Sequence, residues 1–447
     1  MPTSESTSPS APPSAFAQLT RSATARDGVT VMLAQILAIA IALGLDVLLF
    51  RTLPQGERGT LSATLALRNV LLYVADIGLA LTTVRVASGY LASGDTTSAN
   101  AVFRRAFTTR LALASLVLLL AALLAPALTS FPLAAPNRQA LVWAAAAGII
   151  GMTLTSWGVD VAQSTRRFGL YLFHHVLEAG LRALTVALFI LAIQPFACAP
   201  ENILWVMAAA ALVAGLVSTF IHRDIFKQSA PLPPDSRAAL HDQLKSFGRY
   251  AGAVALLQIA GGCVELFLLQ WQSGPVDTAV FDGARRLASV LPIVGGALTT
   301  VLLPRAAALQ STAECAAYVQ KSFLASAAMA LIFAGGLAAC AGVIVPLLWG
   351  ARYDASIPAL RWLCLAYGFS MILNPLSLIL FPLKRLSLLV ALNAASLLLS
   401  LTLGFYFISS QGVAGAVWSA VLSKGISLAL FVGAILWALY TARQKSI

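Results

Sequence analysis

Twelve apolar runs, each long enough to cross a lipid bilayer, constrain this chain more than any other feature of its sequence. A membrane-spanning helix needs about 20 apolar residues, and every backbone polar group must find its hydrogen bond within the segment. Hydrophobic residues make up 59% of the chain and charged residues 10%. A soluble domain is nearer half apolar and a quarter charged. The sequence therefore predicts an all-α polytopic membrane protein, with spans near 28–50, 60–84, 109–130, 139–163, 169–193, 203–221, 248–271, 279–303, 323–348, 358–383, 386–408 and 412–440.

The 29 lysines and arginines are distributed unevenly over the connections between these spans. With twelve spans, nineteen of them fall on one side, Arg110 included, and five on the other, Arg58 included. The positive-inside rule then places both termini and the 222–247 connection in the cytoplasm. The net charge of +12 follows from this topology, so we expect no nucleic-acid partner.

The remaining segments carry little chemistry. Residues 1–27 lack the apolar core of a signal peptide, and we predict a disordered cytoplasmic tail, with a transit peptide as the alternative. A second short tail is expected at 441–447. The five cysteines are scattered singly, without the spacing of a metal site or disulfide framework. No nucleotide-binding loop, HExxH motif or Gly-rich dinucleotide turn is present, so we expect neither an enzyme nor a cofactor.

The chain repeats itself. The octamer IGLALTTV (77–84) is followed 217 residues later by VGGALTTV (294–301), and at that offset Arg68 falls on Arg285. Six spans is an even number, so both halves begin on the same side and form parallel repeats. We therefore predict an N-terminal lobe over 28–221, a linker over 222–247 and a C-terminal lobe over 248–440. A substrate path then lies in a central cavity between the lobes, which rock against each other in alternating access.

Several ionisable residues lie within the predicted spans. A charge at the membrane centre costs at least about 2.5–3.5 kcal/mol, so such side chains normally face protein or a water-filled cavity. The basic candidates are Arg68, Arg182, Arg285, Arg286 and Lys424, and the others are Asp46, Asp76, His174, Glu178, Glu265 and Asp282.

The basic set predicts a cationic site for an anionic head group, because the planar guanidinium binds phosphate oxygens in pairs. The alternative is that Asp46–Arg68 and Glu265–Arg285 are structural ion pairs between neighbouring helices. Lys424 has no acidic residue near it in sequence, which favours a functional role.

The acidic set is open to a second interpretation. Asp46, Asp76, Glu178, Glu265 and His174 are candidates for coupling to H⁺ or Na⁺, or for charge pairing alone. His174, Glu178 and Arg182 share a helix face, as a proton relay or a self-neutralised stripe would. Asp282 and Arg286 form a similar pair that we place at the membrane interface. A glycine pair at 261–262 predicts a bend beside Glu265.

Four segments resemble the bacterial polysaccharide exporters, or O-antigen-type flippases, of the multidrug/oligosaccharidyl-lipid/polysaccharide (MOP) exporter superfamily. They are DIGLALTTVRVASGYLASGDTTSANAVFRRAF (76–107), FDGARRLASVLPIVGGALTTVLLPRAAAL (281–309), VPLLWGARYDASIPALRWLCLAYGF (345–369) and QGVAGAVWSAVLSKG (411–425). The likeness extends over all twelve spans, although each motif is loose and mostly small or apolar.

The resemblance implies a two-lobed flippase of the bacterial inner membrane that moves a polyprenyl-pyrophosphate-linked oligosaccharide, with a polysaccharide polymerase and chain-length machinery as further partners. It assigns the pyrophosphate contact to Arg68, Arg285 and Arg286. Flippases for peptidoglycan precursors usually carry a basic residue in the first span, where this chain has Asp46, which favours an O-antigen or exopolysaccharide substrate. The alternatives are a cation-coupled multidrug antiporter of the same superfamily and, from another class, a membrane-embedded enzyme or assembly subunit of a polysaccharide complex.

Overall fold

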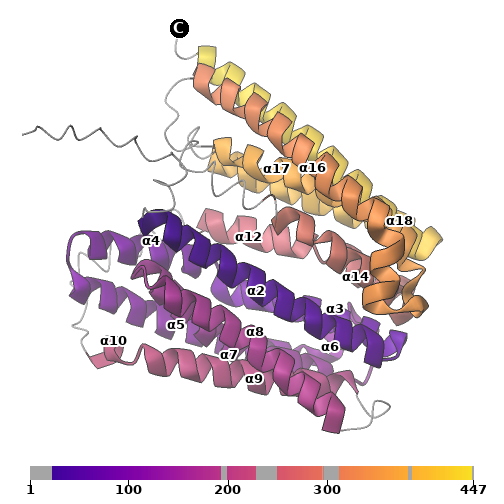
Figure 1. Ribbon diagram of the computed structural model, residues 1–447, viewed down its shortest axis with the longest axis horizontal. Helices are drawn as coiled ribbons and strands as arrows, with labels where there is room; N and C mark the ends of the chain where they lie inside the picture. Colours follow the sequence, from indigo (N-terminus) through magenta and orange to yellow (C-terminus); the bar gives the residue numbers. More distant parts are fainter. Residues whose placement is uncertain are drawn as a thin grey trace, which may run out of the picture.

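The computed structural model describes residues 23–192, 199–227, 249–293, 295, 312–380 and 385–444. Within these ranges the chain is helical and contains no β-strand, which confirms the predicted fold class. Most helices run along the long axis of the molecule (Figure 1).

The first six predicted spans all correspond to helices. A single break divides the second of them, where α3 and α4 are bent by 41°. The elements are α2 (Ala23–Thr52), α3 (Gln55–Asp76), α4 (Leu79–Ala92), α5 (Thr96–Leu123), α6 (Ala125–Ser130), α7 (Ala140–Ser164), α8 (Phe168–Ala192), α9 (Pro200–Ile221) and α10 (Asp224–Lys227).

The described part of the second half contains short helices first and then much longer ones. They are α12 (Arg249–Gly261), α13 (Val264–Gln272), α14 (Pro275–Ala288), α16 (Thr312–Trp349), η3 (Ala351–Tyr353), α17 (Ser356–Ser377), η4 (Leu378–Leu380) and α18 (Leu386–Gln444). The 261–262 glycine pair does separate α12 from α13, as predicted. Helix α18 has 59 residues, enough for two spans of about 20 residues each, and the non-helical backbone of Gly412 (φ 54°) divides it into the last two spans.

The count of spans agrees with the prediction where the structure can be compared. Nine helices in the described residues are long and apolar enough to cross a membrane, and the α3–α4 pair makes ten. Dividing α18 at Gly412 adds another. Helix α14 begins the eighth predicted span, most of whose remainder, including 296–303, lies outside the described residues.

Several helices are longer than the predicted apolar runs. Helix α5 begins at Thr96 instead of 109, and α16 at Thr312 instead of 323. The carboxylate of Asp95 accepts a hydrogen bond from the Ser98 backbone N–H (2.9 Å) and so caps α5 in the polar region. Hydropathy marks only the part of a helix that lies in lipid. The helix itself can extend into water, because its backbone hydrogen bonds do not depend on apolar side chains.

Helices also extend into the segments predicted as tails and linker, for the same reason. Helix α2 begins at Ala23, so the last residues of the predicted 1–27 tail are helical, and α18 continues to Gln444 inside the predicted 441–447 tail. Helix α10 occupies Asp224–Lys227 within the predicted linker. The rest of that linker, and residues 1–22, lie outside the described residues.

The two groups of helices contact each other near both ends of α3, and the contact with α14 is the more extensive one. In Figure 1 the C-terminal end of α2 comes close to α14 and the end of α16, whereas α16 and α18 turn away from α2 at the opposite end. Phe50 and Ala66 of the N-terminal lobe are part of the buried apolar core of the C-terminal lobe. Helices α3 and α14 approach so closely that a Cβ on Gly59 would lie 1.7 Å from the carbonyl oxygen of Pro275.

Candidate functional site

A cluster of three arginines and two aspartates joins the lobes, and Asp282 of α14 lies at its centre. The Asp282 side chain is fully buried. It accepts hydrogen bonds from Arg285 (Nε 3.1 Å, Nη2 2.7 Å) and from Arg286 (Nε 2.8 Å). The i+3 and i+4 spacing of one helix brings these guanidinium groups to the same carboxylate.

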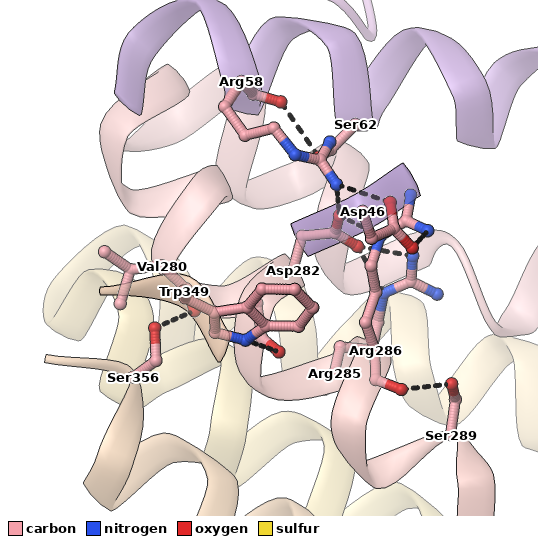
Figure 2. A network of polar contacts seen from close by, with 11 residues as sticks. Asp46, Arg58, Ser62, Val280, Asp282, Arg285, Arg286, Ser289, Trp349 and Ser356 are labelled. Carbon is pink, nitrogen blue, oxygen red and sulfur yellow. Dashed lines mark hydrogen bonds and ion pairs between the residues drawn. The ribbon is translucent and has the colours of Figure 1, made fainter. Parts of the chain in front are cut away.

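Asp46 of α2 connects this group to the other lobe (Figure 2). Its two oxygens accept from Arg58 Nη2 (3.1 Å) and Arg286 Nη1 (2.5 Å). Arg58, at the start of α3, is fully buried and lies 3.6 Å from Asp282 through the same Nη2. It also donates to Ser62 (2.6 Å) and stacks on the Phe50 ring at 4.0 Å. We call Asp46, Arg58, Asp282, Arg285 and Arg286 the inter-lobe network.

The inter-lobe network carries three positive charges and two negative ones. Buried ions are tolerated only when paired and hydrogen-bonded, because the desolvation cost of each is several kcal/mol. Asp46 and Asp282 meet this condition through the three arginines. The side chains of Arg285 and Arg286 are about a quarter exposed.

Polar and aromatic contacts close the same end of the molecule around the network. Phe50 packs against Trp349 with ring centroids 4.3 Å apart, and the Trp349 indole N–H donates to the carbonyl of Gly283 (3.1 Å). Arg51 donates to the carbonyls of Leu347 and Leu348 at the end of α16. In the opposite sense, Arg352 donates to the carbonyl of Phe50 at the end of α2. Each lobe thus satisfies backbone acceptors at a helix end of the other.

Arg68 is placed differently from the arginines of the network. Its residue is 8% exposed, and its Nε is buried without a hydrogen-bond partner. Its charged neighbours are Arg182, Glu178 and Arg286, of which Arg182 and Glu178 pair with each other at 3.0 Å. Within the described part of the chain, no carboxylate forms an ion pair with Arg68. A buried guanidinium of this kind favours an external anion.

Glu265 and Lys424 form a third group, inside the C-terminal lobe. Glu265 of α13 is buried and accepts a hydrogen bond from Ser400 (3.3 Å). Lys424 of α18 interacts electrostatically with Glu265, and its Nζ lies 5.1 Å from the centroid of the Tyr367 ring. Lys424 has no acidic residue near it in sequence, but folding brings Glu265 close to it.

Two further polar groups lie inside the N-terminal lobe. Arg110 of α5 binds Asp160 of α7 (2.5 Å) and Asp76 at the end of α3 (3.2 Å) through one nitrogen, Nη2. His174 of α8 is fully buried and contacts Ser218 (2.9 Å) and His222 (3.1 Å). In the described ranges, no group of three or more His, Cys, Asp or Glu side chains is placed to hold a metal ion.

Comparison with known proteins identifies this architecture by fold. No family model and no curated protein matches the sequence. An inward-facing multidrug resistance MATE family transporter of the MOP superfamily superposes with a TM-score of 0.69 at 14% identity, covering 92% of this chain and 96% of that one. The lipid II flippase MurJ, in an inward closed conformation, gives 0.67 at 12% identity over 93% and 87%. The MATE multidrug transporter DinF-BH, solved in complex with a ligand, gives 0.66 at 16% over 95% and 97%.

The chain shares the fold of these solved structures. This agrees with the predicted fold class.

In this fold, some of the predicted ion pairs between helices are wrong. Asp46 pairs with Arg58 and Arg286 and not with Arg68, and Arg285 pairs with Asp282 and not with Glu265. The pattern of matching positions in the two repeats indicated which helices carry charges. It did not indicate which way each helix is rotated about its axis.

Two other predictions also change. Glu178 and Arg182 do form the predicted pair. His174, on the same predicted helix face, instead contacts Ser218 of α9 and His222, the residue after α9. Asp282, expected at the membrane interface, is fully buried.

Sequence reasoning missed Arg58, Arg110 and Asp160 as buried charges. Arg58 and Arg110 were assigned to connections because they lie at or just outside the ends of apolar runs, whereas α3 and α5 extend past both. Asp160 was detectable, since it is an acidic residue inside the predicted 139–163 span.

Proposed function

We propose that this protein is a membrane flippase that moves a polyprenyl-pyrophosphate-linked oligosaccharide between leaflets by alternating access. The observation that carries the proposal is the excess of guanidinium groups around Arg68 and the inter-lobe network. Five of them stand against three carboxylates: Arg58, Arg68, Arg182, Arg285 and Arg286 against Asp46, Glu178 and Asp282.

An anionic substrate follows from that excess. The acids of the cluster are already bound by the arginines that face them. Arg68 differs from the other four arginines because its Nε is buried without a partner and, among the described residues, no carboxylate forms an ion pair with it. A pyrophosphate offers several oxygens, which suits paired N–H donors on planar guanidinium groups. Arg285 and Arg286 lie on the other lobe and remain partly exposed, so a phosphate held by Arg68 has donors available from both lobes.

The similar structures support movement of a substrate across a membrane, and their names point to two substrate classes. MurJ is described as a flippase for a lipid, lipid II, whereas the MATE proteins are described as multidrug transporters. The second candidate is therefore a cation-coupled multidrug antiporter, favoured by the number of MATE structures with this fold. A cationic drug would be repelled by a net positive cluster, which is why we place the flippase first.

Ion coupling is part of the proposal. Of the acidic candidates, Asp46 forms ion pairs with two arginines, whereas Glu265 accepts a hydrogen bond from Ser400 and interacts electrostatically with Lys424 and Arg285 without a direct ion pair. We propose Glu265 as the acid through which H⁺ or Na⁺ acts, with Asp76, Glu178 and His174 as the alternatives. Transport that continues unchanged after both gradients are collapsed would exclude coupling.

Binding by the purified protein tests the substrate class. We expect polyprenyl pyrophosphate to bind in lipid nanodiscs and Arg68→Gln to weaken binding about tenfold or more, since a charged hydrogen bond contributes about 1.5–3 kcal/mol. Arg223→Gln is the matched control, because Arg223 is exposed and stacks on Phe220. Binding of a cationic dye such as ethidium, with no binding of the pyrophosphate, would refute the flippase function and favour the antiporter function.

A further inference from the structure

The connection between α3 and α4 has an unusual backbone. Ile77 adopts the left-handed conformation (φ 39°, ψ 42°) and Gly78 follows with φ 74°. Glycine adopts this region freely, but a β-branched residue avoids it, and an L-residue there is disfavoured by a factor of about five to thirty. The Ile77 side chain is 52% exposed, so burial does not offset that preference. The surroundings must therefore hold the bend.

Asp76 is the residue that holds it on the N-terminal side. One carboxylate oxygen accepts from the backbone N–H of Ala80 in the first turn of α4 (3.4 Å). The other oxygen pairs with Arg110 of α5 (3.2 Å). Asp76 thus joins the last residue of α3, the first turn of α4 and the core of the lobe.

The opposite lobe contacts the same point. A Cβ on Gly252 of α12 would lie 2.8 Å from the carbonyl carbon of Ile77 and 2.9 Å from its oxygen. Only a glycine lets the helix come this close. The bend therefore lies where the C-terminal lobe touches the N-terminal lobe at the end away from the inter-lobe network.

The ion pair between Asp76 and Arg110 can break without leaving Arg110 unpaired. Asp76 and Asp160 share the single nitrogen Nη2, while Nε and Nη1 of Arg110 are buried without partners. If Asp76 leaves, Asp160 keeps Arg110 neutralised, and 29% of the Asp76 side chain is already exposed at the surface of the lobe. Neither step leaves a bare charge in the interior.

We propose that Ile77 and Gly78 form a hinge in the second membrane span, that α4 moves about this hinge as the lobes change orientation, and that the Asp76–Arg110 pair is the latch that holds α4 bent. Release of the latch lets Ile77 return to a favoured backbone conformation. The inference concerns conformation and does not depend on which substrate is carried.

Distances between spin labels test the hinge in the full chain. Gly89 of α4 and Gly169 of α8 both face open space, so cysteines there can carry labels after the five native cysteines are replaced by serine. We expect a main distance for bent α4, and a second distance whose population rises about fivefold in Asp76→Asn, as loss of an ion pair of about 1 kcal/mol requires. Adding Ile77→Gly, which removes the backbone penalty of the bent form, should restore the main distance.

Asp224→Asn is the control, because Asp224 forms an exposed pair with Lys227 and should leave the distances unchanged. One unchanged distance distribution in Asp76→Asn overturns the latch. If that variant does not fold, Ile77→Gly alone decides: fewer molecules at the second distance support the hinge, and an unchanged or broadened distribution overturns it.

Discussion

Replacing Asp282 with asparagine should destabilise the protein by about 3–5 kcal/mol, because it removes one partner of a buried ion network. Asp282 is fully buried and receives three hydrogen bonds from Arg285 and Arg286, with Arg58 3.6 Å away. In the variant, three guanidinium groups face one carboxylate, that of Asp46, so two positive charges are left uncompensated in place of one.

Thermal unfolding of the purified protein in nanodiscs measures this effect. Asp224→Asn is the matched control: it also removes a carboxylate from a lysine or arginine pair, but that pair is exposed, and such pairs contribute about 0–1 kcal/mol. The double variant Asp282→Asn with Arg285→Gln restores the native charge count and should recover part of the loss. If Asp282→Asn were no more destabilising than Asp224→Asn, the inter-lobe network would not be the buried, paired cluster that we describe.

Two further predictions follow from the packing of the lobes and of the C-terminal core. Gly59→Val should separate α3 from α14, since even a Cβ would overlap the Pro275 carbonyl. Cysteines introduced next to this contact should then become accessible to a membrane-impermeant reagent added on the predicted outer side. Glu265→Gln and Lys424→Met should each lower the unfolding temperature by leaving the other charge unpaired, whereas the double variant should be close to wild type. A double variant as unstable as the sum of the singles would show that the two groups do not interact.

Hydropathy predicted the helices well because it is a local property of the chain. Each of the twelve runs corresponds to a helix wherever the structure describes it, and the break at 261–262 was visible as two adjacent glycines. The bend at Ile77 was not visible, because isoleucine carries no signal for a left-handed backbone and only the contacts of Asp76 and Gly252 hold it there.

The charges were only half predictable. Ionisable residues inside apolar runs identified Asp46, Arg68, Glu265, Arg285, Arg286 and Lys424 as residues that must face protein or water. Arg58 and Arg110 were missed because their hydrophobic neighbours end before their helices do. The pairing of Asp46 with Arg286 joins residues 240 positions apart, and no local pattern contains that information.

The sequence by itself determined that this chain is a bundle of membrane-spanning helices with charges in its interior, since lipid accepts apolar helices and rejects unpaired ions. Only the tertiary structure decided which charges neutralise each other and that Arg68, unlike the buried Arg58 and Arg110, has no carboxylate paired with it among the described residues. The physical reason is that an ion pair depends on the rotation and tilt of two helices, and these are set by packing such as the contact of Gly59 with Pro275.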